Sequence, residues 1–350
     1  MIKILMIAPD DAIYGGGGIA RYANILTHHL DSKFSIKRVV TTKDIGKLKK
    51  IAILIFAILK TIFFLIRYRE VVAHIHLGEE KSFLRKLIFI KLCNFFNRPT
   101  ILHLHSPLIE DDFKKMSKDK QKKIAKVFKE ANKVIVLSEQ AKKWYLTAIE
   151  RREPFVVYNG MDDLLTSNKP LIQRKNIILF LGRLGERKGT YDLIKAFKNV
   201  QKEHPDALLL LAGDGEIDKC KRVVNSLELD SCVKFLGWID IKEKQRLLNS
   251  SKIFVLPSYH EAFPLSILEA MSTGLPIIST RVGGIPEEII DNKSGVLIES
   301  GDILALTLTI NRLLSSPKLC DRLGKKARER YLECFLITKI IKKIEEIYKI

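Results

Sequence analysis

The sequence predicts an α/β protein of two doubly wound domains, and three observations support this fold class. The chain has 350 residues, which is more than one hydrophobic core usually serves, so two domains are expected. Short continuous apolar runs, typical of buried parallel strands, alternate with stretches of helical pattern. This alternation pauses once near the middle of the chain and then begins again.

The first domain is expected at residues 1–165. It opens with an apolar run at residues 2–8, a glycine loop and a helical stretch at residues 19–30, which together form a βα unit. Further strand candidates, interleaved with helical stretches, lie at residues 71–77, 100–106, 133–139 and 155–160. Strands that alternate with helices indicate a parallel sheet covered by helices.

The second domain is expected at residues 172–332, after a polar stretch at residues 162–176 that reads as a linker. Ligands of such sheets bind beyond the carboxyl ends of the strands, so functional residues are expected in the loops there. The strand candidates of this domain lie at residues 176–182, 207–213, 233–237, 252–257, 276–280 and 294–299.

The five cysteines are widely spaced and never stand as C-x-x-C, so reduced thiols are expected. The amino terminus, MIKILMIAPD, is a strand followed by a turn and lacks the apolar core and cleavage site of a signal peptide. We therefore expect a cytoplasmic protein.

The net charge of +20 points to an anionic partner, which can be nucleic acid, a membrane surface or a substrate. The charge is densest from Lys114 to Lys133, where nine lysines stand against Asp119 and Glu130. A solvated helix face is one interpretation and a membrane-docking surface is the other. No recognised nucleic-acid-binding motif accompanies the lysines, and Phe128 is the single aromatic residue among them, so no nucleic acid partner is expected.

A second segment bears on membranes. Residues Ile51 to Ile66 are an apolar run of 16 residues with Lys60 near the middle, flanked by lysines and arginines. A helix that spans a bilayer needs about 20 apolar residues, so we expect a buried or interfacial helix instead. The flanking cations favour anionic headgroups, and contact with an anionic membrane surface is the expectation.

The glycine loop, Gly15 to Gly18, separates the first strand from the first helix. Bare backbone N–H groups and the start of a helix can meet an anion there. The spacing is not the G-x-G-x-x-G dinucleotide fingerprint, and a tight turn without a ligand is the alternative.

Arg183 and Lys188 share the loop after the strand candidate 176–182, and Thr190 is a candidate N-cap for the helix that follows. A guanidinium and an ammonium at the start of a helix suit a diphosphate. The alternative is two exposed cations on a loop.

The segment SYHEAFPLSILEA, Ser258 to Ala270, directly follows the strand candidate 252–257. Glu261 lies in the loop, Pro264 suits the first turn of a helix, and Glu269 falls about one turn inside it. A loop carboxylate can accept sugar hydroxyls, and one a turn later can hold both hydroxyls of a ribose. Solvent-exposed carboxylates that bind no ligand fit the spacing of Glu261 and Glu269 equally well. Farther on, Glu287 and Glu288 stand at a helix start that they could cap, and a ligand role is the secondary alternative.

Four histidines of the first domain, His74, His76, His103 and His105, cluster at strand ends. Alternation puts both members of each pair on one face of its strand. Four histidines can suggest a metal, but no carboxylate or cysteine stands at ligand spacing, and we predict no metal. A histidine at a strand end can orient an acceptor or hold a proton, and His105 is the best placed.

In their order along the chain, these motifs resemble those of the family 4 retaining glycosyltransferases of GT-B architecture, over nearly the whole length. The motifs are GGGGIARY, ILHLHS, VIVLSE, VVYNGMD, FLGRLGERKG, LLLAGDGE, VKFLGW, PSYHEAFPLSILEAMSTGLPIIST and GGIPE. The resemblance implies two Rossmann-like domains facing a cleft, an acceptor-side domain first and a nucleotide-sugar-binding domain second. It also implies that residues 333–350 form a helix crossing back to the first domain.

The implied activity is retaining transfer of a sugar from a UDP- or GDP-sugar to a glycan or lipid-linked glycan, as in polysaccharide or lipopolysaccharide biosynthesis. The nucleotide sugar is then a substrate, and no cofactor is implied. The sequence contains no D-x-D motif, so we expect transfer without a metal. A peripheral enzyme on the inner face of the plasma membrane fits these expectations. The alternative is another chemistry on the same fold, epimerisation of a nucleotide sugar or phosphorolysis.

The resemblance also implies roles for single residues. Arg183 and Lys188 would bind the donor diphosphate, and Glu269 the ribose. The transferred sugar would be held by Glu261 with Phe263, Pro264 and Leu265, the phosphate approached by Gly17 and Gly18, and the acceptor met by His105. The catalytic set is His105, Glu261, Arg183 and Lys188. The family usually reads E-G-F where this chain has Glu261-Ala262-Phe263, so a slightly different sugar pocket is expected.

Overall fold

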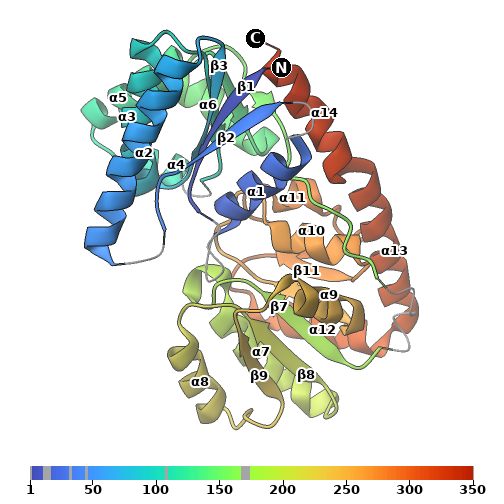
Figure 1. The fold of residues 1–350 in the computed structure, drawn as a ribbon. Coiled ribbons are helices and arrows are strands. Elements are labelled where there is room, and N and C mark those ends of the chain that lie inside the picture. Colours follow the sequence, from blue (N-terminus) through green and yellow to red (C-terminus); the bar gives the residue numbers. More distant parts are fainter. Residues whose placement is uncertain are drawn as a thin grey trace. The chain divides into compact units, whose positions relative to one another are not determined.

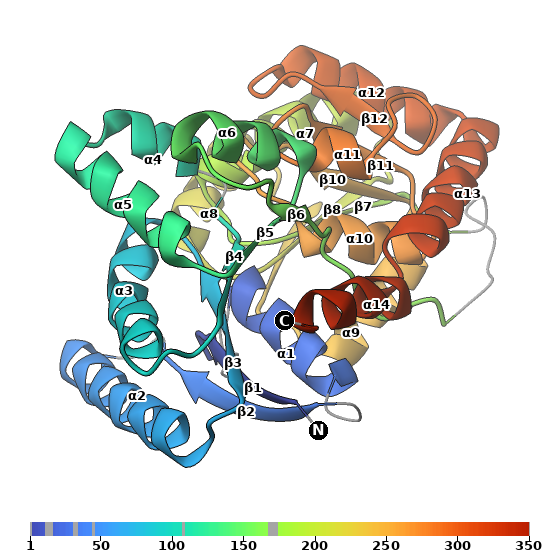
Figure 2. The same ribbon diagram turned by 90° about the horizontal axis from the view of Figure 1, so that it is seen from above.

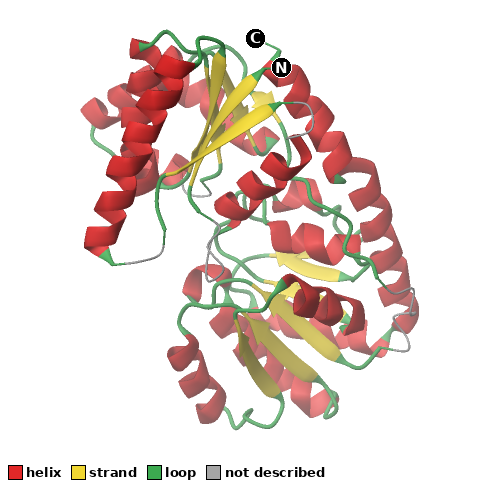
Figure 3. Cartoon of the chain, viewed as in Figure 1, coloured by secondary structure: helices red, strands yellow, loops and turns green. Residues whose placement is uncertain are grey.

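The computed structural model describes residues 2–10, 17–30, 34–43, 46–106, 109–166 and 174–349. The chain divides into two compact units, Met1–Gly160 with Ile337–Ile350, and Met161–Leu336. Each unit is a sheet covered by helices (Figures 1 and 3). Residues 167–173 of the expected linker, and Gly15 and Gly16, lie outside the described residues.

The first unit contains a six-stranded sheet whose strands pair in parallel, in the order β2-β1-β3-β4-β5-β6. The direction in which the chain adds strands reverses between β1 and β3, the kind of place where doubly wound sheets bind ligands. The strands are β1 (Lys3–Ala8), β2 (Ser35–Val40), β3 (Val71–Leu77), β4 (Thr100–Leu104), β5 (Lys133–Val136) and β6 (Phe155–Val156).

Helices cover both faces of this sheet (Figure 2). One face carries α1 (Gly18–Leu30) and α14 (Ile337–Tyr348), which pack against each other. The other face carries α2 (Lys47–Arg67), α3 (Glu80–Phe95), α5 (Lys118–Glu130) and α6 (Glu139–Ile149), with the short α4 (Ile109–Lys115) between α3 and α5 in the chain.

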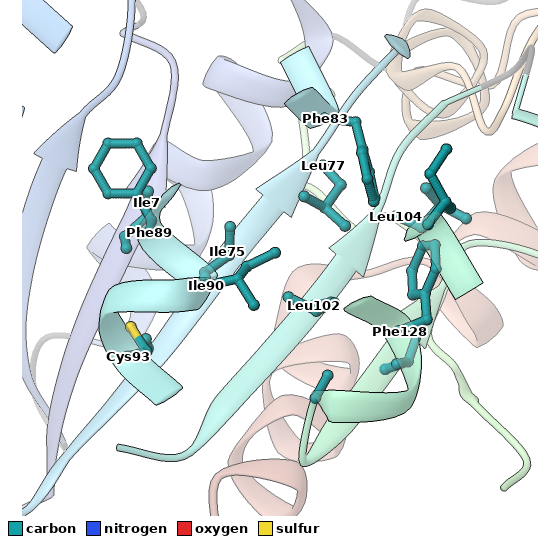
Figure 4. Close-up of a cluster of buried hydrophobic side chains, with 14 of the residues drawn as sticks. Ile7, Ile75, Leu77, Phe83, Phe89, Ile90, Cys93, Leu102, Leu104 and Phe128 are labelled. Carbon is teal, nitrogen blue, oxygen red and sulfur yellow. The ribbon is translucent and has the colours of Figure 1, made fainter. Parts of the chain in front are cut away.

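The two faces of the first sheet have different cores. Ile75 and Leu77 of β3 point toward α3 and α5, where they lie among Phe83, Phe89 and Phe128 (Figure 4). Each such side chain stabilises the unit by about 1.5–3 kcal/mol relative to an exposed one. The alternate residues of β3 are histidines and point to the opposite face, because successive side chains of a strand alternate.

The second unit has its own six-stranded sheet with parallel pairing, in the order β9-β8-β7-β10-β11-β12. This is the order of a dinucleotide-binding sheet, and its reversal lies between β7 and β10. All six strands agree with the strand candidates of the sequence. They are β7 (Ile177–Leu181), β8 (Leu208–Ala212), β9 (Val233–Gly237), β10 (Ile253–Leu256), β11 (Ile277–Thr280) and β12 (Val296–Ile298).

A helix follows almost every strand of the second unit. Helix α7 packs against α12, and α10 packs against α13. The elements are the 3-10 helix η2 (Glu186–Lys188), α7 (Thr190–Glu203), α8 (Ile217–Ser226), α9 (Ile241–Ser250), α10 (Leu265–Ser272), α11 (Ile285–Glu288), α12 (Ile303–Ser315) and α13 (Pro317–Cys334).

The chain returns to the first unit through its last helix. Helix α14 begins at Ile337, slightly later than the expected 333, and its isoleucines and Tyr348 are buried. The Tyr348 hydroxyl lies 2.6 Å from Nδ1 of His74, and Lys133 donates a hydrogen bond of 2.8 Å to the carbonyl of Ile347. These bonds fix the end of the chain to β3 and β5.

Helix α2 is longer than the expected apolar segment and buries only one side. Ala57, Thr61 and Leu65 face the unit, whereas the opposite side of the helix is exposed. Among the residues that the structure describes, no helix is both long and apolar enough to cross a membrane.

Candidate functional site

Half of the sequence-predicted site residues lie on two neighbouring loops of the second unit. The loop after β7 carries Arg183 and Lys188, and the loop after β10 carries Glu261 and Phe263. Because β7 and β10 are adjacent at the reversal of the sheet, their loops leave from neighbouring strand ends.

Lys188 and Glu261 are in direct contact. The Lys188 ammonium pairs with Oε1 of Glu261, and the hydroxyl of Ser258 donates a second hydrogen bond of 2.8 Å to the same oxygen. Both charged side chains are largely buried, with 14% and 7% of their surface exposed. Separating a buried ion pair leaves each charge uncompensated. Neither side chain therefore moves away unless another group takes the place of its partner. The sequence did not single out Ser258 as a partner of Glu261.

The two loops are also joined through Tyr259. Its backbone N–H donates to the carbonyl of Arg187 at 2.9 Å, and its hydroxyl donates to Oδ2 of Asp192 at 2.7 Å. Arg187 in turn reaches the carbonyl of His260 at 3.4 Å. These bonds hold the short helix of Lys188 against the loop of Glu261.

The start of α7 differs from the expectation. Gly189, and not Thr190, is the N-cap, with φ +66°, and an added Cβ would lie 1.9 Å from the carbonyl oxygen of Pro257. Only glycine tolerates both the conformation and this close approach. The hydroxyl of Thr190 instead accepts a hydrogen bond of 3.1 Å from the N–H of Gly185, earlier in the same loop.

A third loop, after β11, packs closely against the backbone of Glu261. Gly283 has φ +54°, and a Cβ there would lie 1.6 Å from the carbonyl oxygen of Glu261. Gly284 donates a hydrogen bond of 2.9 Å to the carbonyl of Ala262. Ala262 is not among the residues with positive φ, so alanine fits the backbone at the position where the resembling family has glycine.

Glu288 lies behind the same loop and is fully buried. Burial raises the pKa of its carboxyl well above the usual value, and the nearby Glu261 raises it further, whereas Lys188 and Arg330 act in the opposite direction. Glu287 and Glu288 lie in the first turn of a helix, as expected, but neither side chain caps it. The helix α11 begins at Ile285 after the N-cap Gly284, without a side-chain cap, and Glu288 is its last residue.

Glu269 has a partner that the sequence did not reveal. It lies inside α10, almost fully buried, and Lys244 of α9 donates to its Oε1 at 3.0 Å. Pro264 is the N-cap of α10 and Leu265 its first residue, so Glu269 is one turn inside the helix, as expected. No motif marks Lys244, because the contact joins two helices that are separated in the sequence by β10.

Arg183 is on the loop of Lys188 but does not share its contact with Glu261. Its guanidinium is exposed and lies 3.6 Å from Oδ2 of Asp214. Phe263, by contrast, is buried, with its ring 5.7 Å from that of Phe335. The structure therefore brings Lys188, Glu261 and Phe263 into a fixed arrangement and leaves Arg183 at the surface of the loop.

The remaining predicted residues, Gly17, Gly18 and His105, belong to the first unit. Gly17 precedes α1, Gly18 is its first residue, and the N–H of Ala20 donates to the carbonyl of Gly17 at 3.0 Å. An added Cβ on either glycine would meet nothing within 4 Å among the described residues. Both are exposed at the start of the helix.

The four histidines share one face of the sheet, which confirms the expectation from strand alternation. His74 and His103 are joined by a hydrogen bond of 3.1 Å between ring nitrogens, and His76 and His105 by one of 2.8 Å. Burial lowers the pKa of His74 to about 3 and holds the pKa values of the other three well below the usual range. All four rings are therefore neutral at physiological pH.

Ring nitrogens of His74, His76 and His103 lie within 4.8 Å of one another, a separation that a metal ion could bridge. The nitrogens of His74 and His103 point directly at each other, however, as a hydrogen-bonded pair requires.

Lys86 of α3, which the sequence did not single out, is buried beside this cluster and donates to the carbonyl of His76. Burial lowers the pKa of Lys86 to about 7.

Residues 164–330 match the family model of the glycosyl transferases group 1. N-acetyl-alpha-D-glucosaminyl L-malate synthase of Bacillus anthracis is 35% identical over 202 residues, 55% of this chain and 52% of that protein. UDP-Gal:alpha-D-GlcNAc-diphosphoundecaprenol alpha-1,3-galactosyltransferase of Escherichia coli is 29% identical over 208 residues, 55% and 53% of the two chains. The chain spans about half the length of these curated relatives.

Solved structures resemble the chain over its whole length. Sucrose-phosphate synthase of Thermosynechococcus elongatus has a TM-score of 0.83 at 21% identity, covering 100% of this chain and 98% of that one. HepE of Anabaena, in complex with UDP-glucose, has a TM-score of 0.80 at 19% identity, covering 99% of each chain. At these identities the likeness concerns the fold, and it confirms the expected architecture of two Rossmann-like domains.

Proposed function

We propose that the chain transfers a sugar from a nucleotide-sugar donor to a glycan or lipid-linked glycan. The match of residues 164–330 to the family model of the glycosyl transferases group 1 supports this proposal. The observation that carries this proposal is the contact of Lys188 with Glu261 at the reversal of the second sheet. It places one cation and one carboxylate where such a sheet binds a nucleotide.

In this function the donor diphosphate competes with Glu261 for the Lys188 ammonium. Arg183, exposed on the same loop, adds a forked donor for the diphosphate oxygens. Glu261 then turns to the sugar hydroxyls, with the backbone of Phe263, Pro264 and Leu265 beside it. Glu269 holds the ribose hydroxyls, in exchange for or together with Lys244.

Transfer proceeds with retention of the anomeric configuration in this proposal. The acceptor hydroxyl attacks the anomeric carbon from the face that the nucleoside diphosphate leaves, the bond to the diphosphate breaks, and the hydroxyl proton passes to the leaving phosphate. Cations aimed at the diphosphate stabilise its developing charge more in the transition state than in the ground state. NMR of the product tests this point, and an inverted anomeric configuration would contradict it.

The cations of the loop after β7 take the place of a metal in this scheme, and the sequence has no D-x-D motif. We expect transfer to continue in EDTA. Loss of transfer in EDTA, restored by manganese, would overturn metal independence.

The substitution Lys188→Ala tests the proposed site. We expect transfer to fall by about 10²-fold or more, the effect of losing one group that stabilises charge in the transition state. Lys195→Ala, an exposed lysine on the neighbouring helix α7, is the matched control and should leave transfer unchanged. Equal activity of the two variants would remove Lys188 from the site.

The donor is identified by a panel of UDP-, GDP- and ADP-sugars scored for thermal stabilisation of the protein. A cognate donor at about 100 times its dissociation constant adds about 2.7 kcal/mol to the free energy of unfolding. Incubation with this donor and no acceptor should give at most slow hydrolysis. Conversion into another nucleotide sugar under the same conditions would favour an epimerase over a transferase.

For the acceptor we propose a lipid-linked glycan met at an anionic membrane surface, on the cytoplasmic side. Support comes from the outer side of α2, an exposed apolar face that has no acidic residue and is followed by Leu84, Ile88 and Phe95 on the adjacent α3. Such a face with flanking cations suits the headgroup boundary of a bilayer. The α2 face consists of Leu48, Ile51, Ile55, Phe56, Leu59, Phe63 and Ile66.

Vesicle flotation tests this part of the proposal. The protein should float with anionic vesicles at low salt, and less so at high salt, because the contribution of Lys49, Lys50 and Arg67 is screened. Absence from anionic vesicles at low salt would contradict membrane docking.

A further inference from the structure

A row of side chains in the first unit crosses three neighbouring strands, from Met6 in β1 through His76 in β3 to His105 at the end of β4. The Met6 sulfur lies 3.0 Å from Nε2 of His76, and Nδ1 of His76 lies 2.8 Å from Nε2 of His105. Met6 and His76 are fully buried, and His105 is almost so. The row reaches the carboxyl end of the sheet at His105, beside the reversal between β1 and β3.

The contact with the Met6 sulfur determines which ring nitrogen of His76 carries the proton. A thioether sulfur can accept a hydrogen bond but has none to donate. A lone pair on Nε2 would therefore face the lone pairs of the sulfur, and a buried nitrogen without a partner costs about 1–3 kcal/mol. His76 is neutral because burial lowers its pKa. Its one ring proton is thus on Nε2, and Nδ1 is an acceptor.

The proton of His105 follows from that of His76. Nε2 of His105 faces the acceptor Nδ1 of His76, so it must be the donor of this hydrogen bond. Burial holds the pKa of His105 well below its usual value, and the positive charge of Lys86 opposes its protonation. The second nitrogen, Nδ1, therefore carries no proton. None of the described residues hydrogen-bonds to it.

We propose that Met6 and His76 are positioning residues that hold His105 in the tautomer with an unprotonated Nδ1, which accepts a hydrogen bond from a hydroxyl group of the sugar substrate. The inference rests on the proposed glycosyl transfer. A lone pair at this atom attracts a hydroxyl and repels a phosphate oxygen, which is also an acceptor. His105 thus selects the hydroxyl-bearing part of the substrates.

The groups around the histidine pair keep this arrangement constant through neutral pH. The ring centroid of Tyr22 in α1 lies 5.7 Å from those of His103 and His105, in edge-to-face geometry. The rings of His74 and His103 stack against His76. Lys86 of α3 donates to the carbonyl of His76. Below its pKa of about 7 it is positively charged, and this charge opposes protonation of the histidine pair in the range where protonation would otherwise begin. Within the described part of the chain, no carboxylate shifts the pKa of His76 or His105.

NMR of protein labelled with ¹⁵N in histidine measures the tautomer directly and needs no transfer reaction. The His105 signals are assigned by their loss in His105→Asn. We expect Nδ1 unprotonated and Nε2 protonated, without titration between about pH 6 and 8. A proton on Nδ1, or titration in this range, overturns the inference even if the protein transfers sugar. The expected tautomer in a protein that transfers no sugar would contradict the proposed function alone.

Substitutions separate the positioning role from general packing. His76→Leu removes the acceptor for His105, whereas His76→Asn places an amide oxygen near the position of Nδ1. The leucine variant should show mixed tautomers of His105 and about tenfold slower transfer, the effect of one lost hydrogen bond. The asparagine variant should restore both. A rise in the KM of the donor assigns the hydroxyl to the donor sugar, and a rise in that of the acceptor assigns it to the acceptor.

Met6→Leu tests the first member of the row. This substitution keeps the apolar volume but removes the sulfur. Nε2 of His76 then has no acceptor for its proton, and the tautomer with the proton on Nε2 is no longer favoured. Met116→Leu, a half-buried methionine at the opposite core of the same unit, is the control. Mixed His105 tautomers in Met6→Leu and a single tautomer in Met116→Leu support the inference. A single unchanged tautomer in both Met6→Leu and His76→Leu overturns it.

Discussion

Glu261 and Glu269 each pair with a lysine, but they differ in what the pairing does to nucleotide binding. Glu261 neutralises Lys188, the proposed diphosphate ligand, whereas Glu269 is itself the proposed ribose ligand. Glu269→Ala should therefore weaken UDP or GDP binding by about tenfold to 10²-fold, as for a lost hydrogen bond to a charged group. Glu261→Ala should impair transfer and leave this affinity intact or slightly higher, because Lys188 is released.

Calorimetry with the nucleoside diphosphate measures this difference. Glu243→Ala serves as the control, since the side chain of this partly exposed glutamate of α9 pairs only with its helix neighbour Arg246 in the described contacts. Equal loss of affinity in the Glu261 and Glu269 variants would refute the division of roles.

Glu288 gives a prediction about stability. Its pKa is raised in the folded protein, so below about pH 4.3 the carboxyl is protonated in both states. Above that pH the unfolded chain releases the proton while the folded chain keeps it. The free energy of unfolding then falls by about 1.4 kcal/mol per pH unit until the folded pKa is reached. Glu288→Gln removes this loss, because glutamine has no proton to release.

The stabilisation by Glu288→Gln should therefore grow as the pH rises above about 4.3, until the folded pKa of Glu288 is reached. Thermal unfolding at several pH values checks this, with Glu228→Gln, an exposed glutamate, as the control. A gain in stability that does not depend on pH would show that Glu288 is ionised in the folded protein.

At the scale of whole elements, α2 exposes large apolar side chains that tertiary packing does not bury. Its exposed face forms a stripe along one side of the helix, opposite Ala57 and Leu65. Phe56→Glu combined with Phe63→Glu should abolish flotation with anionic vesicles without lowering the melting temperature by more than a few degrees, because both rings are exposed.

The matched control is Leu304→Glu with Leu308→Glu, which introduces the same charges at exposed apolar positions of α12 in the second unit. This pair should leave flotation unchanged. Equal loss in both double variants would mean that net charge, and not the α2 face, governs vesicle binding.

The elements show which parts of the fold the sequence can predict. Buried strands such as β3 and β8 are continuous apolar runs, and the six strands of the second unit were all recognisable. The edge strand β2 was not, because Lys37 and Arg38 interrupt its apolar pattern and most of its residues are half-buried. An edge strand is stabilised by pairing with its neighbour, which a local pattern does not contain.

The site was predictable to the same extent. Glu261, Lys188 and Glu269 stand out because each lies on a loop or helix directly after a recognisable strand. Their partners Ser258 and Lys244, and the support from Gly283, depend on contacts between separate segments. Such contacts follow from the order of strands in the sheet, and one sequence does not specify that order.

At the scale of the whole molecule, the two units should respond to acid in opposite ways. The folded pKa values of the four buried histidines in the first unit lie below the unfolded value of about 6.5. Their contribution to stability is complete above pH 6.5 and is lost as the pH falls toward the folded values, about 3 for His74. Glu288 in the second unit has the opposite dependence, since its raised pKa favours the folded state at lower pH.

Between about pH 6.5 and pH 4.5, acid should therefore destabilise the first unit selectively. Hydrogen exchange followed by mass spectrometry would show this as faster opening of β3, β4 and α14, while β7 and β10 keep their protection. The substitution His74→Asn should reduce the effect, because one proton fewer is taken up on unfolding, whereas His28→Gln, on the exposed side of α1, should not. Uniform loss of protection in both units would mean that general charge repulsion, at a net charge of +20 and rising, outweighs the buried histidines.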